Sequence, residues 1–121
     1  MVQLRSMLNL ADNSGAKRLM VIGVSRRIGK VATVGQLVRC SVKGAEPNGA
    51  VQNKEVVTAV VVRTRKEIGR PDGSYLRFDD NAAVVIDKQG LPRGTRVLGP
   101  IAREVKEAGY SKIASLAREV I

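Results

Sequence analysis

The chain has 121 residues and carries 21 Lys and Arg against 11 Asp and Glu, which gives it a formal net charge of +10 at pH 7. It contains no His, so no Ser-His-Asp or Cys-His catalytic site can form, and its single Cys can neither close an intrachain disulfide nor help to build a four-ligand zinc site. We therefore expect no enzyme, no catalytic residue, no metal ligand and no cofactor, although 44% apolar residues are enough for a folded core.

Strands dominate the first hundred positions. Val is the most abundant residue, with 18 copies concentrated before position 100, and β-branched residues interrupted by Gly and Asn indicate a sheet. In chain order, the predicted strands span residues 7–10, 17–24, 36–42, 55–65, 74–78 and 82–86. Alternation places Val38, Cys40 and Val42 on one face of the third strand, as burial of one side requires. The almost uniformly apolar run 56–62 predicts a central strand that is covered on both faces.

The breaks between strands predict how they are connected. Asp12-Asn13-Ser14-Gly15 combines four turn-forming residues, and Pro71-Asp72-Gly73 is expected to join strands 55–65 and 74–78 in a hairpin. The connections are too short for crossover helices, which favours an antiparallel meander that closes into a small barrel. Because no linker or repeat interrupts the chain, we expect one domain over 1–121, with the barrel in 1–98 and a helical region in 99–121 packed on it.

A short helix is predicted at the start of this C-terminal region. Pro100 suits the first position of a helix, and Gly109 can end it. Between them, Ile101, Val105 and Ala108 recur at helical spacing. This pattern predicts a helix of about two turns whose apolar side covers the barrel.

A second short helix is predicted over residues 112–117. Ile113, Leu116 and Ala117 share one side of this segment. We expect that side, like that of the preceding helix, to pack against an open end or side of the barrel.

The excess of cations indicates a polyanionic partner. Thirteen of the 21 cations are Arg, whose planar guanidinium matches phosphate oxygens in pairs. The chain has no basic amphipathic helix of useful length and no window near the ~20 apolar residues of a membrane span, so we expect a soluble intracellular protein without a membrane partner. Only Tyr75, Phe78 and Tyr110 could stack on bases, which favours contact with folded RNA backbone over unstacked bases.

Cations gather in two turn regions. Glycines near the first region let backbone approach a phosphate closely, and a basic hairpin such as the second can enter an RNA groove. The alternative is that both turns are merely solvated. We favour phosphate contact, and the residues concerned are Arg26, Arg27 and Lys30 in the first region and Arg63, Arg65, Lys66 and Arg70 in the second.

Sequence blocks with defined spacing extend along the whole chain. Ala59-Val60-Val61-Val62 is followed after nine residues by Asp72-Gly73, and then by Phe78, Asn81 and Val84-Val85. Together with the segments 7–17, 94–100 and 112–117, these blocks resemble the signature of large-subunit ribosomal protein fourteen, a universal family, in its bacterial form.

The resemblance implies a five-stranded β-barrel with a C-terminal helical region that serves as a structural component of the large ribosomal subunit. We expect a cytoplasmic ribosome, with the ribosome of an organelle as the alternative. The implied partners are large-subunit rRNA, small-subunit rRNA at intersubunit bridges, ribosomal proteins three and nineteen of the large subunit, and a ribosome-silencing factor. Family contacts for that factor match Thr95, Arg96 and Lys112. The predicted rRNA-binding residues are Lys17, Arg18, Arg26, Arg27, Lys30, Lys43, Lys54, Arg63, Arg65, Lys66 and Arg70.

Alternatives remain at three points. Thr95 could be a structural turn residue, with Arg96 and Lys112 as rRNA ligands. Arg118 stands where bacterial members commonly have Pro, so the last helix could extend further. A protein-interaction adaptor with a basic surface is the second hypothesis for function, and a single-strand binder with an oligonucleotide-binding barrel is disfavoured because it would need more aromatic residues.

Overall fold

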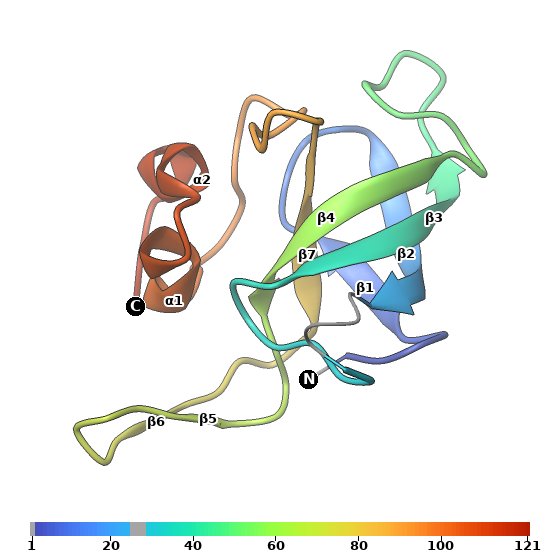
Figure 1. Ribbon diagram of the computed structural model, residues 1–121. Coiled ribbons are helices and arrows are strands. Elements are labelled where there is room, and N and C mark those ends of the chain that lie inside the picture. The colour runs from blue at the N-terminus through green and yellow to red at the C-terminus, as the bar shows by residue number, and fades with distance from the viewer. Residues whose placement is uncertain (1, 25–28) are drawn as a thin grey trace.

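The computed structural model describes residues 2–24 and 29–121 and shows a β-barrel beside a pair of short helices (Figure 1). The strands are β1 (Met7–Leu10), β2 (Ala16–Val24), β3 (Leu37–Ala45), β4 (Val56–Arg63), β5 (Ile68–Gly69), β6 (Tyr75–Leu76) and β7 (Ala82–Ile86), and the helices are α1 (Arg103–Glu107) and α2 (Ser111–Leu116). The strand order β1-β2-β3-β4-β7 closes the barrel, while β5 and β6 form a separate two-stranded sheet. The predicted closed five-stranded barrel with short C-terminal helices is therefore confirmed.

One pairing in the barrel differs from the predicted antiparallel arrangement. Strand β1 runs parallel to β7, with Asn9 beside Ala82, whereas the four other pairings of the described barrel are antiparallel. The reason is parity. When five strands alternate in direction around a closed ring, the first and the fifth point the same way, so the pairing that closes the ring has to be parallel.

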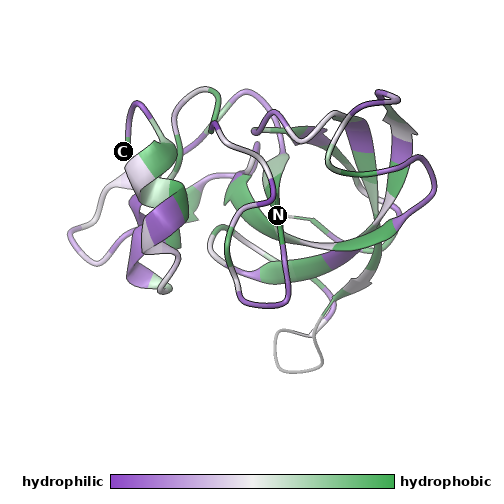
Figure 2. Cartoon of the chain, turned by 90° about the horizontal axis from the view of Figure 1, so that it is seen from above, coloured by the Kyte–Doolittle hydropathy of each residue, from purple (hydrophilic) through white to green (hydrophobic). Residues whose placement is uncertain are grey.

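Apolar side chains form two cores, one inside the barrel and one between the barrel and the helices. On β4, Val57, Ala59 and Val61 belong to the inner core, while Val60 and Val62 belong to the outer one. The prediction that this strand is covered on both faces is thus confirmed. The outer core joins the barrel to the helical region, which lies at its side in both views (Figure 2).

The third strand has the predicted inward face. Val38, Cys40 and Val42 are all buried in the inner core. Burial raises the pKa of the Cys40 thiol to about 12, so this side chain is an unreactive core residue, as its position in the alternation indicated.

The hairpin around Pro71 exists, but its pairing differs from the prediction. Strand β4 pairs with β7, and the hairpin joins the short strands β5 and β6 instead of the predicted strands 55–65 and 74–78. The long ladder ends because the Thr64 hydroxyl donates to the Lys66 carbonyl, and the Asn81 side chain accepts from the backbone N–H of Arg65. These bonds turn the chain out of the barrel, so the hairpin projects away from it (Figure 1).

Helix α1 begins later than predicted. Pro100 does not start the helix, because Ile101 is held in an extended bridge with Val120 and Ala102 is the N-cap. Ala108 is exposed, contrary to the apolar side predicted for it, whereas Val105 is buried. Gly109 ends the segment as predicted, with a φ of +104° that few other residues adopt.

Helix α2 ends at Leu116, so Arg118 does not extend it. The next residue, Ala117, is already extended, with a ψ of 143°. The chain then runs beside Ile101, whose N–H donates to the Glu119 carbonyl at 3.0 Å. Because residues 119–121 are paired with Ile101 in an extended bridge, they cannot continue the helix.

Candidate nucleic-acid interface

Exposed cations lie side by side on the outer surface of β2 and β3. Arg18 and Lys43 are directly opposite each other in the antiparallel ladder, and the Lys17 side chain lies over Gly44. Like charges at opposed positions destabilise a sheet unless an anion lies between them. None of the three cations takes part in an ion pair among the described residues. This arrangement suits a bound phosphate chain.

Lys54 adds a fourth cation beside this pair. Its backbone N–H donates to the Val42 carbonyl at 2.9 Å, which places it next to Lys43 across the connection between β3 and β4. It holds a left-handed backbone conformation, with a φ of +66°, and its side chain is exposed. We call Arg18, Lys43 and Lys54 the basic face. Lys17, which precedes Arg18 in β2, lies on the other side of the strand, over Gly44.

The hairpin carries two further exposed cations. Arg65 donates from Nε to the Asp79 carbonyl at 3.1 Å, and Lys66 lies 3.7 Å from Glu67 in an ion pair that water reaches freely. Such surface pairs contribute little to stability, so both side chains can exchange their partner for a phosphate at small cost.

Arg63, by contrast, is engaged inside the protein. Its side chain is only 12% exposed, its Nε lies 3.1 Å from Asp80 Oδ1, and its Nη1 donates to the carbonyls of Leu98 and Pro100 at 3.0 and 3.3 Å. The guanidinium thereby ties the end of β4 to the segment that leads into the helices. Its predicted contact with rRNA would have to coexist with these bonds.

Arg70 is also held by internal partners. Its Nη2 and Nε donate to the two carboxylate oxygens of Glu104 at 2.9 and 3.4 Å, and its Nη1 donates to the Ile121 carbonyl at 2.9 Å. Burial alone would raise the pKa of Glu104, but the hydrogen bonds and charge of Arg70 outweigh it and lower that pKa. Arg70 therefore fastens the hairpin to α1 and the C-terminal segment.

The first predicted cluster of cations is described only in part. Arg26 and Arg27 lie outside the described residues, and Lys30 is exposed. The structure therefore brings together Arg18, Lys43 and Lys54 on one face and Arg65 and Lys66 on the hairpin. It leaves Lys17 exposed on the other side of β2, and it gives Arg63 and Arg70 internal partners.

A second polar region joins the turn 12–15 to the loop 93–97. Asp12 is 5% exposed, and its carboxylate accepts from the N–H and hydroxyl of Ser14 and from the N–H of Val85. Burial raises the pKa of this carboxyl, and the three hydrogen bonds oppose that rise. Asp12 also forms an antiparallel bridge with Val97, so the loop is pinned against the turn.

Asn13, next in this turn, organises two of the predicted docking residues. Its Oδ1 accepts from the backbone N–H groups of Thr95 and Arg96 at 2.8 and 2.9 Å, and its Nδ2 donates to Thr95 Oγ1 at 2.8 Å. Local sequence alone predicts only a turn at Asn13. The signal that could have revealed its role is the closely spaced polar group Asp12-Asn13-Ser14, which has more hydrogen-bonding capacity than its own turn can use.

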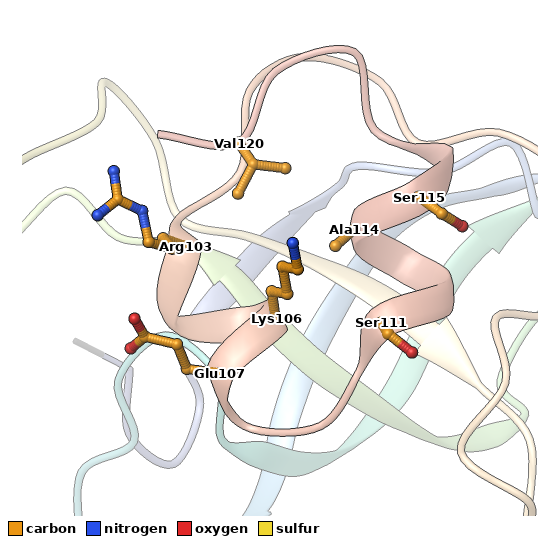
Figure 3. A pocket seen from close by; sticks show the side chains of 7 residues that line it. All are labelled: Arg103, Lys106, Glu107, Ser111, Ala114, Ser115 and Val120. Atoms are coloured by element: carbon orange, nitrogen blue, oxygen red, sulfur yellow. The ribbon is translucent and has the colours of Figure 1, made fainter.

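Lys112, the third predicted docking residue, lies on α2 and is exposed. Its neighbour Ile113 and Arg96's neighbour Val97 are both buried in the outer core. An open groove lies between α1 and α2. Lys106 points between the two helices, and Ser111 and Ser115 line the groove on the α2 side (Figure 3). Residues next to Arg96 and Lys112 in the chain thus belong to the same core.

Within the ranges 2–24 and 29–121, no group of three or more His, Cys, Asp or Glu side chains is arranged to hold a metal ion. No helix among these residues is long and apolar enough to cross a membrane. The outstanding feature of the described surface is its charge.

These features define a class of protein: a small, strongly basic β-barrel whose role is structural. They are the closed barrel, its basic face and the projecting basic hairpin. The family model described as ribosomal protein L14p/L23e matches residues 1–121, so the chain belongs to this family. It is 61% identical over 121 residues to the large ribosomal subunit protein uL14 of Petrotoga mobilis (strain DSM 10674 / SJ95), with 99% of each chain covered. It is 54% identical over 121 residues to the protein of the same name from Aquifex aeolicus (strain VF5), with 100% of each covered.

Membership of this family confirms several expectations from the sequence. The chain is a structural component of the large ribosomal subunit, resides in the cytoplasmic ribosome and is not an enzyme. As a large-subunit protein, it has rRNA and ribosomal proteins as partners.

Proposed function

We propose that the protein binds large-subunit rRNA through the basic face and the exposed hairpin cations, and that it contributes to bridges with small-subunit rRNA. The observation that carries this proposal is the cross-strand pair of Arg18 and Lys43, which lie opposite each other with no acidic partner among the described residues. A rigid barrel holds these cations at constant spacing, so that binding costs little side-chain or loop ordering.

The proposed mechanism is architectural. Arg and Lys neutralise converging phosphates and release the counterions condensed on the RNA, which supplies sequence-independent affinity. The hairpin extends this contact away from the barrel, and Arg70 sets its direction through Glu104. The protein would then join rRNA segments that approach the barrel and the hairpin from different sides.

Binding to an rRNA fragment is expected to weaken steeply with salt. At about six phosphate contacts, the slope of log affinity against log salt concentration should be about −4 to −5. The double change Arg18→Ala and Lys43→Ala should make the slope shallower by about 1.5, since two contacts are lost. Filter binding or fluorescence anisotropy between about 50 and 300 mM salt measures both values, at ionic strengths where surface charges are progressively screened.

The control for this experiment is Lys88→Ala, which removes an exposed cation from the turn after β7 and should leave the slope unchanged. A slope near zero for the unaltered protein would contradict the electrostatic mechanism. Co-sedimentation separates the proposal from the adaptor hypothesis, because a ribosomal component stays with large subunits through a high-salt wash and an adaptor remains in the supernatant.

We further propose that Thr95, Arg96 and Lys112 form a docking surface for a ribosome-silencing factor, and that ribosomal proteins three and nineteen are neighbours in the subunit. The three residues are exposed, and Val97 and Ile113, which follow Arg96 and Lys112 in the chain, are both buried in the outer core. A factor bound there would obstruct subunit joining if this surface faces the small subunit.

Arg96→Ala and Lys112→Ala are each expected to weaken binding of a purified bacterial ribosome-silencing factor by about tenfold, since a charged hydrogen bond contributes on the order of 1.5 kcal/mol or more. Both side chains are exposed, so the unfolding transition should not move. Calorimetric titration and urea unfolding measure the two quantities. Unchanged affinity in both variants would refute the docking surface.

A further inference from the structure

In the loop that carries Thr95 and Arg96, the Asn13 side chain determines which groups donate hydrogen bonds and which accept them. We propose that Asn13 is a positioning residue that leaves the Thr95 hydroxyl proton free, so that all three side chains of the docking surface can donate and are met by a carboxylate on an acidic protein partner. This inference rests on the docking surface proposed above and adds to it the residue that orients it and the chemistry of the group that it accepts.

The polarity follows from which atoms can donate. Backbone N–H groups only donate, so the Asn13 atom that faces those of Thr95 and Arg96, at 2.8 and 2.9 Å, has to be the oxygen. The other end of the side chain is therefore the amide nitrogen, and it donates to Thr95 Oγ1 at 2.8 Å. Because Oγ1 is an acceptor in this bond, its own proton points elsewhere.

The loop is held too firmly to invert this arrangement. A Cβ on Gly94 would come within 2.8 Å of Asn13 Oδ1, so the two segments are in close contact at that point. The backbone N–H of Leu98 donates to the Ala11 carbonyl, and Asp12 is bridged to Val97. Contacts on both sides of Thr95 thus keep the loop in register with the turn.

Each of the three exposed side chains on this surface can donate a hydrogen bond. Among the described residues, no acceptor takes the Thr95 hydroxyl proton, and neither the Arg96 guanidinium nor the Lys112 ammonium has an ion-pair partner. All three residues are exposed. A carboxylate accepts through two oxygens and carries the complementary charge, so an acidic protein face satisfies both requirements.

Asn13→Asp tests the proposal by reversing one bond. The variant keeps an oxygen for the two backbone N–H groups but replaces the amide donor with a second oxygen, which takes the Thr95 hydroxyl proton inward. Affinity for a purified bacterial ribosome-silencing factor should fall about three- to tenfold, the range of one hydrogen bond. Thr95→Val, which removes the hydroxyl, should lower it by a similar factor. Urea unfolding and rRNA-fragment binding should change little in either variant.

The double variant Asn13→Asp with Thr95→Val separates two effects of Asn13→Asp: the reversed hydrogen bond to Thr95 and the added negative charge. If Asn13 acts through Thr95, Asn13→Asp in the Thr95→Val background should add less than about twofold. If it acts by repelling the partner, the full loss should return, and the proposal is overturned. Asn53→Asp is the matched control, since Asn53 also accepts a backbone N–H, that of Gly44, but beside the basic face. It should weaken rRNA binding and leave factor binding unchanged.

The remaining outcomes also decide between the two proposals. If Arg96→Ala weakens factor binding but Asn13→Asp does not, the docking surface stands and the positioning role of Asn13 is wrong. If the unaltered protein does not bind the factor, the docking surface itself fails. If Asn13→Asp weakens rRNA binding and not factor binding, the loop serves rRNA and an acidic protein partner is excluded.

Discussion

Replacing Asp12 with Ala is expected to lower the free energy of unfolding by about 3 kcal/mol. The carboxylate is 5% exposed and accepts from Ser14 N at 3.2 Å, Ser14 Oγ at 2.8 Å and Val85 N at 3.0 Å. Alanine would leave the Val85 N–H in β7 without an acceptor where water does not reach, and each such group costs about 1–3 kcal/mol. For a chain of this size, the midpoint of thermal unfolding should fall by on the order of 10 °C.

Asp72 provides the matched control. Its Oδ1 also accepts from the N–H and hydroxyl of the serine two residues later, Ser74, at 3.0 and 2.6 Å, but this turn is exposed and makes no third bond of that kind. Asp72→Ala should therefore have only a small effect on unfolding. Equal losses in the two variants would show that the local turn, rather than the buried bond to Val85, accounts for the role of Asp12.

Arg63→Ala is expected to cost about 3 kcal/mol of unfolding free energy, because it removes one partner of a largely buried ion pair. The variant leaves Asp80 without its cation and the carbonyls of Leu98 and Pro100 without the donor at 3.0 and 3.3 Å. These bonds connect the barrel to the helical region. We propose that 1–98 and 99–121 unfold as one domain, so calorimetry should show a single transition at a lower temperature.

Arg65→Ala is the control for this change, since Arg65 lies two residues further on and is exposed. It should alter stability little and weaken rRNA binding. A variant of Arg63 that loses rRNA affinity with no loss of stability would instead support the role predicted from its charge. Two separate unfolding transitions would contradict the single domain.

The barrel could be predicted because its strands carry their burial pattern locally. The alternation of Val38, Cys40 and Val42 and the apolar run in β4 depend only on neighbouring positions and on the pleat. The start of α1 could not be predicted in this way. Ile101 lies in a segment with helical spacing but pairs with Val120, and a bridge between distant residues leaves no trace in local periodicity.

In the candidate site, too, local sequence predicts some features, while others depend on contacts between distant residues. The sequence indicated which cations gather in turns, but Arg65 and Arg70 look alike in that respect and differ in the folded protein. Arg70 meets Glu104, which is 34 residues away, whereas Arg65 remains at the surface. Local sequence predicts a turn at Asn13 but not its bonds to Thr95 and Arg96, because these bonds span 82 and 83 residues. Local patterns therefore locate charge, and only the fold decides which charges remain free for a partner.

The parallel pairing of β1 with β7 has a consequence for the order in which the protein is made and folded. Strands β1, β2 and β3 can pair as they leave the exit tunnel, but β1 meets its second neighbour only when Ala82 and Ala83 have been synthesised. Until then, one edge of β1 is open to other chains, a known hazard for aggregation. Contacts between such distant segments also slow folding. We therefore expect closure of the barrel to be a late event, so that a nascent chain that binds RNA through β2 and β3 would do so before its barrel is complete.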